Sequence, residues 1–250
     1  MADVRYILMS SAVEPSNKTP FQVLIEPKIR FKQTQKAIRK WLRSSKKDGP
    51  ILVLGDNTGW AKSIAQSFPG PIADGRLQII DVAKPNLDTV GKGKGSAEAF
   101  TLLTMLDTIR APKDAFVGKV NGRYFCNNWK FLTERIDQNT DFAAWPSSNL
   151  DSIDSRFFVS KAGILMLILQ NVALETDDVS GNYAEMLYAK YSITSPNVKF
   201  QRFDYSPAIE GYSGTSGDKI SWLGEYRTVS VFVRFRIMIY KFWKKVNNKD

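Results

Sequence analysis

Two short clusters of glycine, lysine and arginine have the residue types needed to bind phosphate. The first, Gly91 to Glu98, reads GKGKGSAE and opens a segment with helical spacing. Glycine lets the backbone approach a phosphate closely, a helix start offers N–H groups, and Lys92 and Lys94 add positive charge. The cluster is not a Walker motif, because no Gly-Lys-Ser/Thr stands at the required spacing. A flexible surface turn in which Ser96 caps the helix is the alternative interpretation.

The second cluster, Gly118 to Phe125, reads GKVNGRYF and lies at the end of a strand-like segment. Lys119 and Arg123 stand on either side of Asn121, and this spacing can point two cations and an amide into one crevice, which suits a diphosphate. Asn-Gly is also a strong signal for a hairpin turn, in which both charges would face solvent. Both interpretations remain open at this point.

The composition excludes several kinds of chemistry. The chain has no histidine and its only cysteine is Cys126, so a zinc site has almost no ligands and an intramolecular disulfide is impossible. Acid/base catalysis must therefore fall to Asp, Glu, Lys or Tyr. The net charge of +10 predicts attraction to nucleic acid, an anionic membrane or a diphosphate substrate. A basic nucleic-acid-binding module is one alternative, but the sequence has no zinc-finger, RRM or KH signature to support it.

Apolar runs alternate with helical patterns and predict an α/β domain with a largely parallel sheet, in which ligands bind beyond the carboxyl ends of the strands. The predicted strands are Val4 to Ser10, Ile51 to Leu54, Leu77 to Val82 and Ala115 to Val120. The predicted helices are Arg30 to Ser44, Trp60 to Ser67, Ser96 to Ile109, Lys161 to Leu174 and Tyr183 to Tyr191, and Pro207 to Asp218 is a predicted Gly/Ser loop. Apolar stretches fall short of the ~20 residues that span a bilayer and the start lacks a secretory pattern, so we expect a cytoplasmic protein.

The order of these motifs resembles bacterial lipopolysaccharide and capsule glycosyltransferases of the WavE-like kind. The resemblance rests on a strand ending in Gly55-Asp56, the helix start Lys92 to Glu98, Lys119 to Phe125, and Asp154 to Phe158, which reads DSRFF. It implies a GT-A-like single domain over residues 1–225 and a glycosyltransferase of hexosyltransferase type. The implied reaction moves a sugar from a nucleotide sugar to a lipid-linked or polysaccharide acceptor in lipopolysaccharide, O-antigen or capsule synthesis, with no cofactor besides this donor substrate.

The chain departs from ordinary GT-A enzymes at the Asp-x-Asp motif, which holds a divalent cation against the donor diphosphate. No two aspartates stand two residues apart, and the expected place carries Lys119, Asn121 and Arg123. Side-chain cations can stabilise the charge of a leaving nucleoside diphosphate in place of a metal. The sequence therefore predicts metal-independent transfer, with Lys119 and Arg123 as the main diphosphate clamp and Lys92 or Lys94 assisting.

The resemblance also implies contacts to the rest of the donor and to the sugars. Asp56 follows the strand at which such enzymes often bind the base or ribose, although Asp56 to Gly59 also fits a turn and helix cap. Asp154 can bind sugar hydroxyls, and Arg156 can bind phosphate or hold Asp154 in place. A surface salt bridge between Asp154 and Arg156 is the alternative.

An inverting transfer needs a carboxylate near the acceptor hydroxyl, and in GT-A folds this base usually lies at the start of a late helix. Glu185 fits that place, with Asp177 and Asp178 as rivals, and a solvated glutamate is the alternative. A retaining mechanism would need no such base. Glu210 lies on the predicted Gly/Ser loop, which could cover the acceptor.

The C-terminal residues 226–250 form a predicted basic amphipathic tail. Arg227, Arg234, Lys241 and Lys245 recur along one side of a helix that also carries apolar and aromatic residues. Such a helix can lie on the anionic inner face of the cell membrane, where a lipid-linked acceptor is held. A final strand, or packing against the catalytic domain, is the alternative for this segment. For the whole chain, an S-adenosylmethionine-dependent methyltransferase is a second enzymatic interpretation, resting on the VLGDNTG turn.

Overall fold

The computed structural model describes residues 3–16, 23–45, 48–85, 92–213 and 216–221. Its centre is a seven-stranded sheet with the strand order β3-β2-β1-β4-β7-β6-β8. The strands are β1 (Val4–Ser11), β2 (Ile51–Asp56), β3 (Leu77–Asp81), β4 (Phe116–Asn121), β6 (Phe142–Ala144), β7 (Phe157–Lys161) and β8 (Phe200–Arg202). The predicted tail, residues 226–250, lies outside the described residues, so its helix stays a prediction.

Most strand pairs are parallel, as the apolar runs predicted. β3, β2, β1 and β4 pair in parallel, and so do β6 and β8. β7 runs antiparallel to both β4 and β6. Because β2 lies on one side of β1 and β4 on the other, the chain changes direction across the sheet beside β1.

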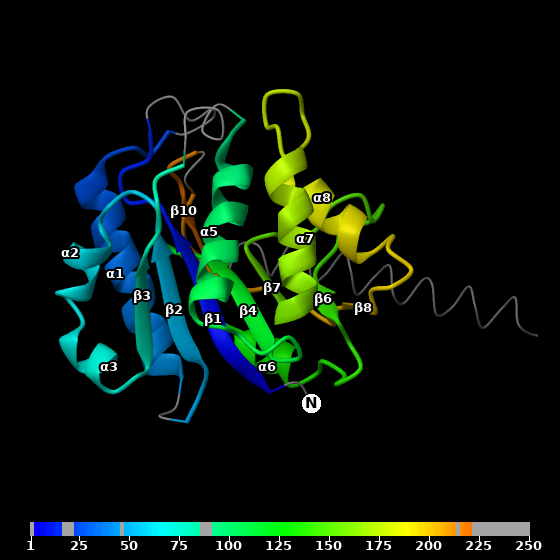
Figure 1. Cartoon of the computed structure of the whole chain (residues 1–250), viewed down its shortest axis with the longest axis horizontal. Helices are drawn as coiled ribbons and strands as arrows, with labels where there is room; N and C mark the ends of the chain where they lie inside the picture. Colours follow the sequence, from blue (N-terminus) through cyan, green and yellow to red (C-terminus); the bar gives the residue numbers. More distant parts are fainter. Residues whose placement is uncertain (1–2, 17–22, 46–47, 86–91, 214–215, 222–250) are drawn as a thin grey trace, which may run out of the picture.

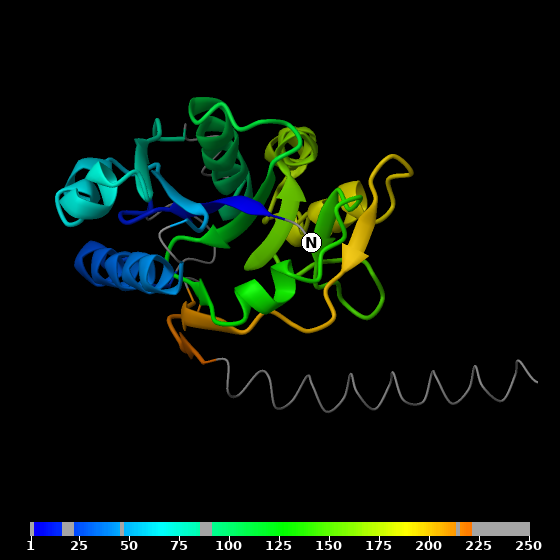
Figure 2. The same ribbon diagram turned by 90° about the horizontal axis from the view of Figure 1, so that it is seen from below.

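Helices cover both faces of the sheet, as Figures 1 and 2 show. They are α1 (Pro27–Ser44), α2 (Ala61–Ala65), α3 (Pro69–Ala73), α5 (Lys94–Thr108), α6 (Trp129–Thr133), α7 (Ala162–Glu175) and α8 (Ala184–Ser192). The buried side of α1, with Ile38 and Trp41, packs in one apolar cluster with Ile7 and Leu54 of the sheet. α5, α7 and α8 belong to a second cluster, which includes Leu8 and Val53 of the same two strands. The alternation of side chains along each strand therefore feeds two separate cores.

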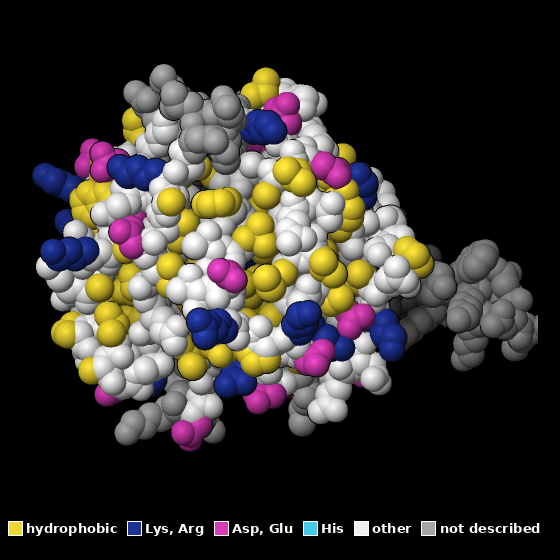
Figure 3. All heavy atoms as spheres, viewed as in Figure 1, with side chains coloured by type: hydrophobic (Ala, Val, Ile, Leu, Met, Phe, Trp, Pro, Cys, Tyr) yellow, Lys and Arg dark blue, Asp and Glu magenta, His cyan; other side chains and the backbone are white. Residues whose placement is uncertain are grey.

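The outer sides of α5 and α7 leave large hydrophobic side chains at the surface, and the space-filling view shows hydrophobic side chains spread over this face (Figure 3). Phe100 of α5 is 44% exposed and Leu167 of α7 is 59% exposed. No helix among the described residues is long and apolar enough to cross a membrane.

Part of the predicted Gly/Ser loop, Ile209–Tyr212, belongs to a small antiparallel sheet. β5 (Phe125–Cys126), β9 (Ile209–Tyr212) and β10 (Lys219–Ile220) form it in the order β10-β9-β5. The prediction of a loop was wrong here, because Ile209 is buried and β9 pairs with β5, a partner distant in sequence. Glu210 consequently lies in a strand, where it forms an ion pair with Lys40 of α1.

Candidate functional site

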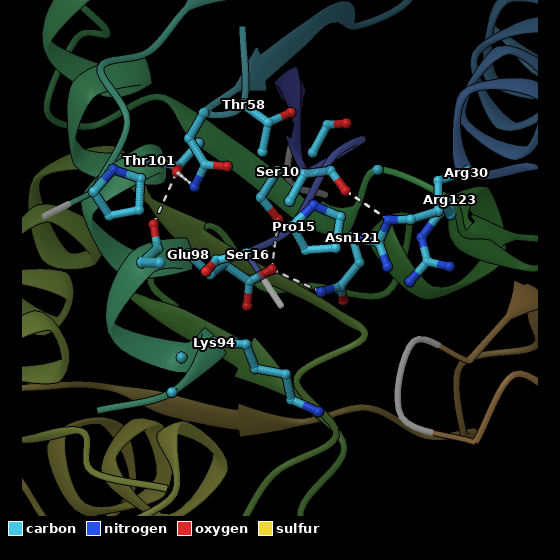
Figure 4. Close-up of a pocket in the computed structure, with 18 of the residues that line it drawn as sticks. Ser10, Pro15, Ser16, Arg30, Thr58, Lys94, Glu98, Thr101, Asn121 and Arg123 are labelled. Atoms are coloured by element: carbon cyan, nitrogen blue, oxygen red, sulfur yellow. Dashed lines mark hydrogen bonds between the residues drawn. The ribbon is translucent and has the colours of Figure 1, made fainter. Parts of the chain in front are cut away.

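A cavity of about 780 Å³ lies beyond the carboxyl ends of β1, β2 and β4, where the strand order changes direction. Ligand sites in proteins typically have volumes of roughly 300–1,000 Å³. Several elements supply its lining: Ser10 and Ser11 from β1, Asn57 and Thr58 after β2, Asn121 and Arg123 at the end of β4, Arg30 from α1, Lys94 and Glu98 from α5, Arg156 before β7, and Asp178 and Glu185 near α8. Figure 4 labels Ser10, Arg30, Thr58, Lys94, Glu98, Asn121 and Arg123 among them. The fold thus brings together three of the sequence motifs predicted to carry chemistry.

Glu98 anchors a hydrogen-bond network inside this cavity. Its Oε1 accepts hydrogen bonds from Ser10 Oγ at 2.5 Å and from Asn121 Nδ2 at 2.7 Å. Its Oε2 accepts one from Lys119 Nζ at 3.0 Å. The network joins α5 to β1 and β4 and fixes the amide of Asn121 at the cavity wall. Sequence reasoning missed this role of Glu98, although a lysine in a buried strand is itself a signal that a nearby carboxylate must neutralise it.

Lys119 does not fill the predicted role of a diphosphate clamp. Its side chain is fully buried, and its ammonium is occupied by Glu98, by the carbonyl of Ser155 at 2.7 Å and by Asn121 Oδ1 at 3.4 Å. The prediction failed because Lys119 and Asn121 lie on the same side of β4, under α5, and only Asn121 is far enough along the strand to line the cavity. Lys119 instead ties the sheet to α5 and to the loop before β7.

Asp56 is also withdrawn from the ligand. Its carboxylate is fully buried, and Oδ1 accepts hydrogen bonds from Thr58 N at 2.9 Å and Trp60 N at 3.0 Å. Oδ2 accepts one from Val13 N at 3.2 Å. The turn of the alternative interpretation describes Asp56, whereas α2 begins after Trp60 without a side-chain cap. The predicted contact of Asp56 with the base or ribose does not fit this geometry. Its neighbour Thr58 lines the cavity in its place.

Arg123, which was predicted to bind the diphosphate, lines the cavity. It lies beside Arg30, a residue that the sequence analysis did not single out. Figure 4 shows the two guanidinium groups side by side. Arg30 is only 4% exposed, and burial together with the charge of Arg123 lowers its pKa to about 9. Burial likewise lowers the pKa of Arg123. Among the described residues no carboxylate forms an ion pair with either arginine, so this end of the cavity holds concentrated positive charge.

The start of α5 has a side-chain cap that the sequence did not reveal. Asp178 Oδ2 accepts a hydrogen bond from Lys94 N at 3.0 Å. Gly93 has φ 114°, and a Cβ there would fall 2.1 Å from Asp178 Oδ2, so this position needs glycine. Lys94 lines the cavity, whereas Lys92 is exposed outside its lining and the Lys92 carbonyl accepts from Asp178 N. The structure therefore places Lys94, and not Lys92, at the site.

Two carboxylates stand near this helix start. Glu185, in the first turn of α8, lines the cavity and accepts a hydrogen bond at Oε1 from Ser155 Oγ at 2.7 Å. Asp178 lines it too, and burial raises the pKa of that carboxyl, with a smaller contribution from the charge of Glu185. Asp177, outside the lining, accepts from Val179 N and Ser180 N in a turn. Of the three candidates for the base, Glu185 and Asp178 remain.

Asp154 and Arg156 form the pair that was the alternative interpretation. Asp154 Oδ1 accepts from Arg156 Nε at 2.9 Å, and Oδ2 accepts from Nη2 at 2.8 Å. Arg156 lines the cavity and Asp154 does not. Both oxygens of Asp154 thus face its partner, so the predicted catalytic role of Asp154 does not fit this geometry. Its carboxylate positions the Arg156 guanidinium.

The residues at the end of β4 do not suit a divalent cation. Such an ion needs several oxygen ligands, and the residues of this segment that line the cavity include one amide, Asn121, and one guanidinium, Arg123. Among the described residues no group of three or more His, Cys, Asp and Glu could hold a metal ion.

No protein-family model matches this chain, and no curated protein matches it. Among solved structures, the bifunctional glycosyltransferase WbbM superimposes with a TM-score of 0.50 at 10% identity, over 81% of this chain and 39% of WbbM. The glycosyltransferase GlyE of Streptococcus pneumoniae TIGR4 gives 0.47 at 8% identity, over 80% and 45% of the two chains. HddC from Yersinia pseudotuberculosis gives 0.44 at 10% identity, over 83% and 93%. Together with the largely parallel sheet, the superposition on WbbM shows a GT-A-like fold, and the chain spans well under half the length of WbbM.

Proposed function

We propose that this protein transfers a sugar from a nucleoside diphosphate sugar to a hydroxyl of a glycan or lipid-linked acceptor. The observation that carries the proposal is the composition of the cavity at the switch point of a GT-A-like fold. Cationic side chains, Lys94, Arg123 and Arg156, share this cavity with the carboxylates Glu185 and Asp178. A diphosphate needs the first group, and an acceptor hydroxyl needs a base from the second.

In the proposed reaction the acceptor oxygen attacks the anomeric carbon of the donor sugar. The bond from that carbon to the phosphate oxygen breaks, and the electron pair leaves with the nucleoside diphosphate. In the inverting form, Glu185 takes the proton of the acceptor hydroxyl. Ser155 orients this carboxylate through its hydrogen bond to Oε1. Arg123 stabilises the charge of the leaving group, and Asn121, fixed by Glu98, supplies an amide to the same region.

We propose that the reaction proceeds without a divalent cation, because the end of β4 places the Arg123 guanidinium and the Asn121 amide where a metal would need several oxygen ligands. Activity should survive EDTA. Loss of activity in EDTA that is restored only by manganese or magnesium would contradict this part of the proposal.

The first test of the function is a thermal-shift and hydrolysis screen of nucleotide sugars. Stabilisation by UDP, GDP or CMP, together with hydrolysis of a matching sugar nucleotide, would support the proposal. Stabilisation by S-adenosylhomocysteine alone would favour the methyltransferase interpretation. The methyltransferase interpretation rested on the turn after β2. The Asp56 carboxylate of that turn accepts hydrogen bonds from backbone N–H groups of the turn itself, which argues against a role in binding a cofactor.

We assign the acceptor to the surface glycans, namely lipopolysaccharide, O-antigen or capsule. This assignment rests on the WavE-like resemblance of the sequence motifs and on the basic, aromatic tail at 226–250, which suits an anionic inner membrane surface carrying a lipid-linked acceptor. Assaying transfer to lipid-linked glycan against free oligosaccharide tests it.

A further inference from the structure

Arg30 and Arg123 are distant in the sequence and lie beside each other at one wall of the cavity (Figure 4). Arg30 begins the second turn of α1, and Arg123 follows β4. Both line the cavity. Arg30 is held rigidly, because its Nε donates to the carbonyl of Ala12 at 2.7 Å and its Nη1 to the carbonyl of Leu24 at 2.8 Å. The uncharged carbonyls fix the direction of the guanidinium without neutralising it.

Arg123 is held in a similar way. Its Nη1 donates to Gln33 Oε1 at 3.1 Å, and Gln33 lies one turn beyond Arg30 on α1. The described partners thus use Nε and Nη1 of Arg30 and Nη1 of Arg123. Nη2 of Arg30, and Nε and Nη2 of Arg123, donate to no residue within the described part of the chain.

Holding two guanidinium groups together costs free energy in the absence of an anion. The lowered pKa of Arg30 is consistent with this cost: burial is the main cause, repulsion by Arg123 adds to it, and the charges of Asp56 and Tyr124 offset only part. A protein that keeps such a pair at a cavity wall gains when an anion enters. A guanidinium group binds two phosphoryl oxygens in a planar, bidentate geometry that the ammonium of a lysine cannot reproduce.

We propose that Arg30 and Arg123 together form a phosphoryl-binding site in which both guanidinium groups hold one phosphoryl group of the substrate. The site's existence does not depend on sugar transfer; only the source of the phosphoryl group rests on the proposed function, which identifies it as the donor diphosphate. A phosphorylated acceptor offers the same chemistry from a second source.

The test is calorimetric titration with inorganic pyrophosphate at neutral pH. We compare the wild-type protein with Arg123→Gln and with Arg30→Lys, which keeps the positive charge but cannot form bidentate hydrogen bonds. The control is Lys32→Gln, on the exposed side of the same helix. Losing paired, charge-assisted hydrogen bonds should raise the dissociation constant roughly tenfold or more in both arginine variants, with little change in the control. Equal affinity in all four proteins, equal losses in the control, or no pyrophosphate binding by the wild type would overturn the proposal.

Thermal unfolding without ligand separates binding from a structural role. Arg123→Gln removes the repulsion on Arg30, so its melting temperature should equal or exceed that of the wild type, while the stabilisation by pyrophosphate should be lost. A lower melting temperature with undiminished pyrophosphate affinity would show that Arg123 is structural and would contradict the site.

Two further titrations identify the source of the phosphoryl group. If it belongs to the donor, the arginine variants lose affinity for UDP or GDP but not for the parent nucleosides. If the loss appears only with glucose 1-phosphate, the site stands and its ligand is a phosphorylated acceptor. Pyrophosphate binding without any sugar transfer would contradict the proposed function and leave the phosphoryl site intact.

Discussion

The inferred role of Lys119 changes from binding a ligand to stabilising the fold once its partners are known. Its ammonium has oxygen partners on α5, on β4 and on the loop before β7, and none of its surface reaches solvent. A buried cation of this kind holds the surrounding elements together without contacting a ligand. Replacing Lys119 should therefore lower the free energy of unfolding more than the affinity for the donor.

We expect Lys119→Met to lower the free energy of unfolding by about 3 kcal/mol, because it leaves the Glu98 carboxylate uncompensated in a largely buried place. Urea unfolding measures this loss. The double variant Lys119→Met with Glu98→Leu should recover much of it, since neither charge is then left alone. A single variant as stable as the wild type would show that the ion pair is unimportant to the fold.

Glu185 is the carboxylate whose position best fits an acceptor-side base. Glu185→Gln should abolish transfer while leaving donor affinity unchanged, because the amide keeps the shape and the contact with Ser155 but cannot take the proton. Single-turnover transfer and nucleotide titration measure the two effects separately. Retained transfer would direct attention to Asp178, the other carboxylate in the lining, or to a retaining mechanism.

At the scale of elements, the start of α5 is the place where two parts of the chain depend on each other. The helix N-terminus was predicted to face a phosphate, and the Asp178 carboxylate takes the Lys94 N–H instead. A carboxylate suits a helix N-terminus, but burial works against its charge and raises the pKa of Asp178 above the ordinary value of 3.8. The neighbouring Asp177 has the opposite shift, chiefly because Ser180 N donates to its carboxylate.

These opposite shifts give a paired prediction on pH. A raised folded-state pKa means that the charged Asp178 costs stability at neutral pH, and this cost disappears below about 3.8, where the carboxyl is protonated in both states. Asp178→Asn should therefore be more stable than the wild type at pH 7, with the difference vanishing toward pH 3.5. Asp177→Asn should be less stable than the wild type at pH 7. The pKa of Asp177 is lowered in the folded state, so its charged carboxylate stabilises the fold at pH values above the unfolded-state pKa. Denaturant unfolding at both pH values checks the signs, and equal shifts in the two variants would contradict the assignment.

At the scale of the whole molecule, the charge is distributed unevenly between the described domain and the tail. The segment after Glu225 carries Arg227, Arg234, Lys241 and Lys245 among apolar residues. If it anchors the protein, full-length chain should co-sediment with anionic liposomes at low salt, less so at moderate salt, while a truncation after Glu225 should stay in the supernatant. Equal recovery of both forms would exclude the segment as the anchor. Preserved activity of the truncation on a soluble acceptor would separate anchoring from catalysis.

The architecture could be read from the sequence to a large extent. Val4 to Ser10, Ile51 to Leu54 and Ala115 to Val120 are apolar enough to be central strands, and the structure confirms them as β1, β2 and β4. Burial leaves a periodic trace along each segment, so element type and the carboxyl-end location of the cavity follow from local patterns. Arg123 and Glu185, which line the cavity, were singled out in the same way, because each lies at the end or start of a predicted element.

The tertiary structure alone decided which side chains of those elements meet. Arg30 lies beside Arg123, more than ninety positions away in the sequence, and Lys119 forms an ion pair with Glu98 of α5 (Figure 4). The loop predicted after Pro207 likewise contains β9, paired with a distant strand. Apolar periodicity records that a residue is buried but carries no information about its partner, and partners depend on strand register and helix packing between distant segments. The sequence by itself therefore determined the GT-A-like framework, while the packing of that framework decided which charges face a ligand and which neutralise each other.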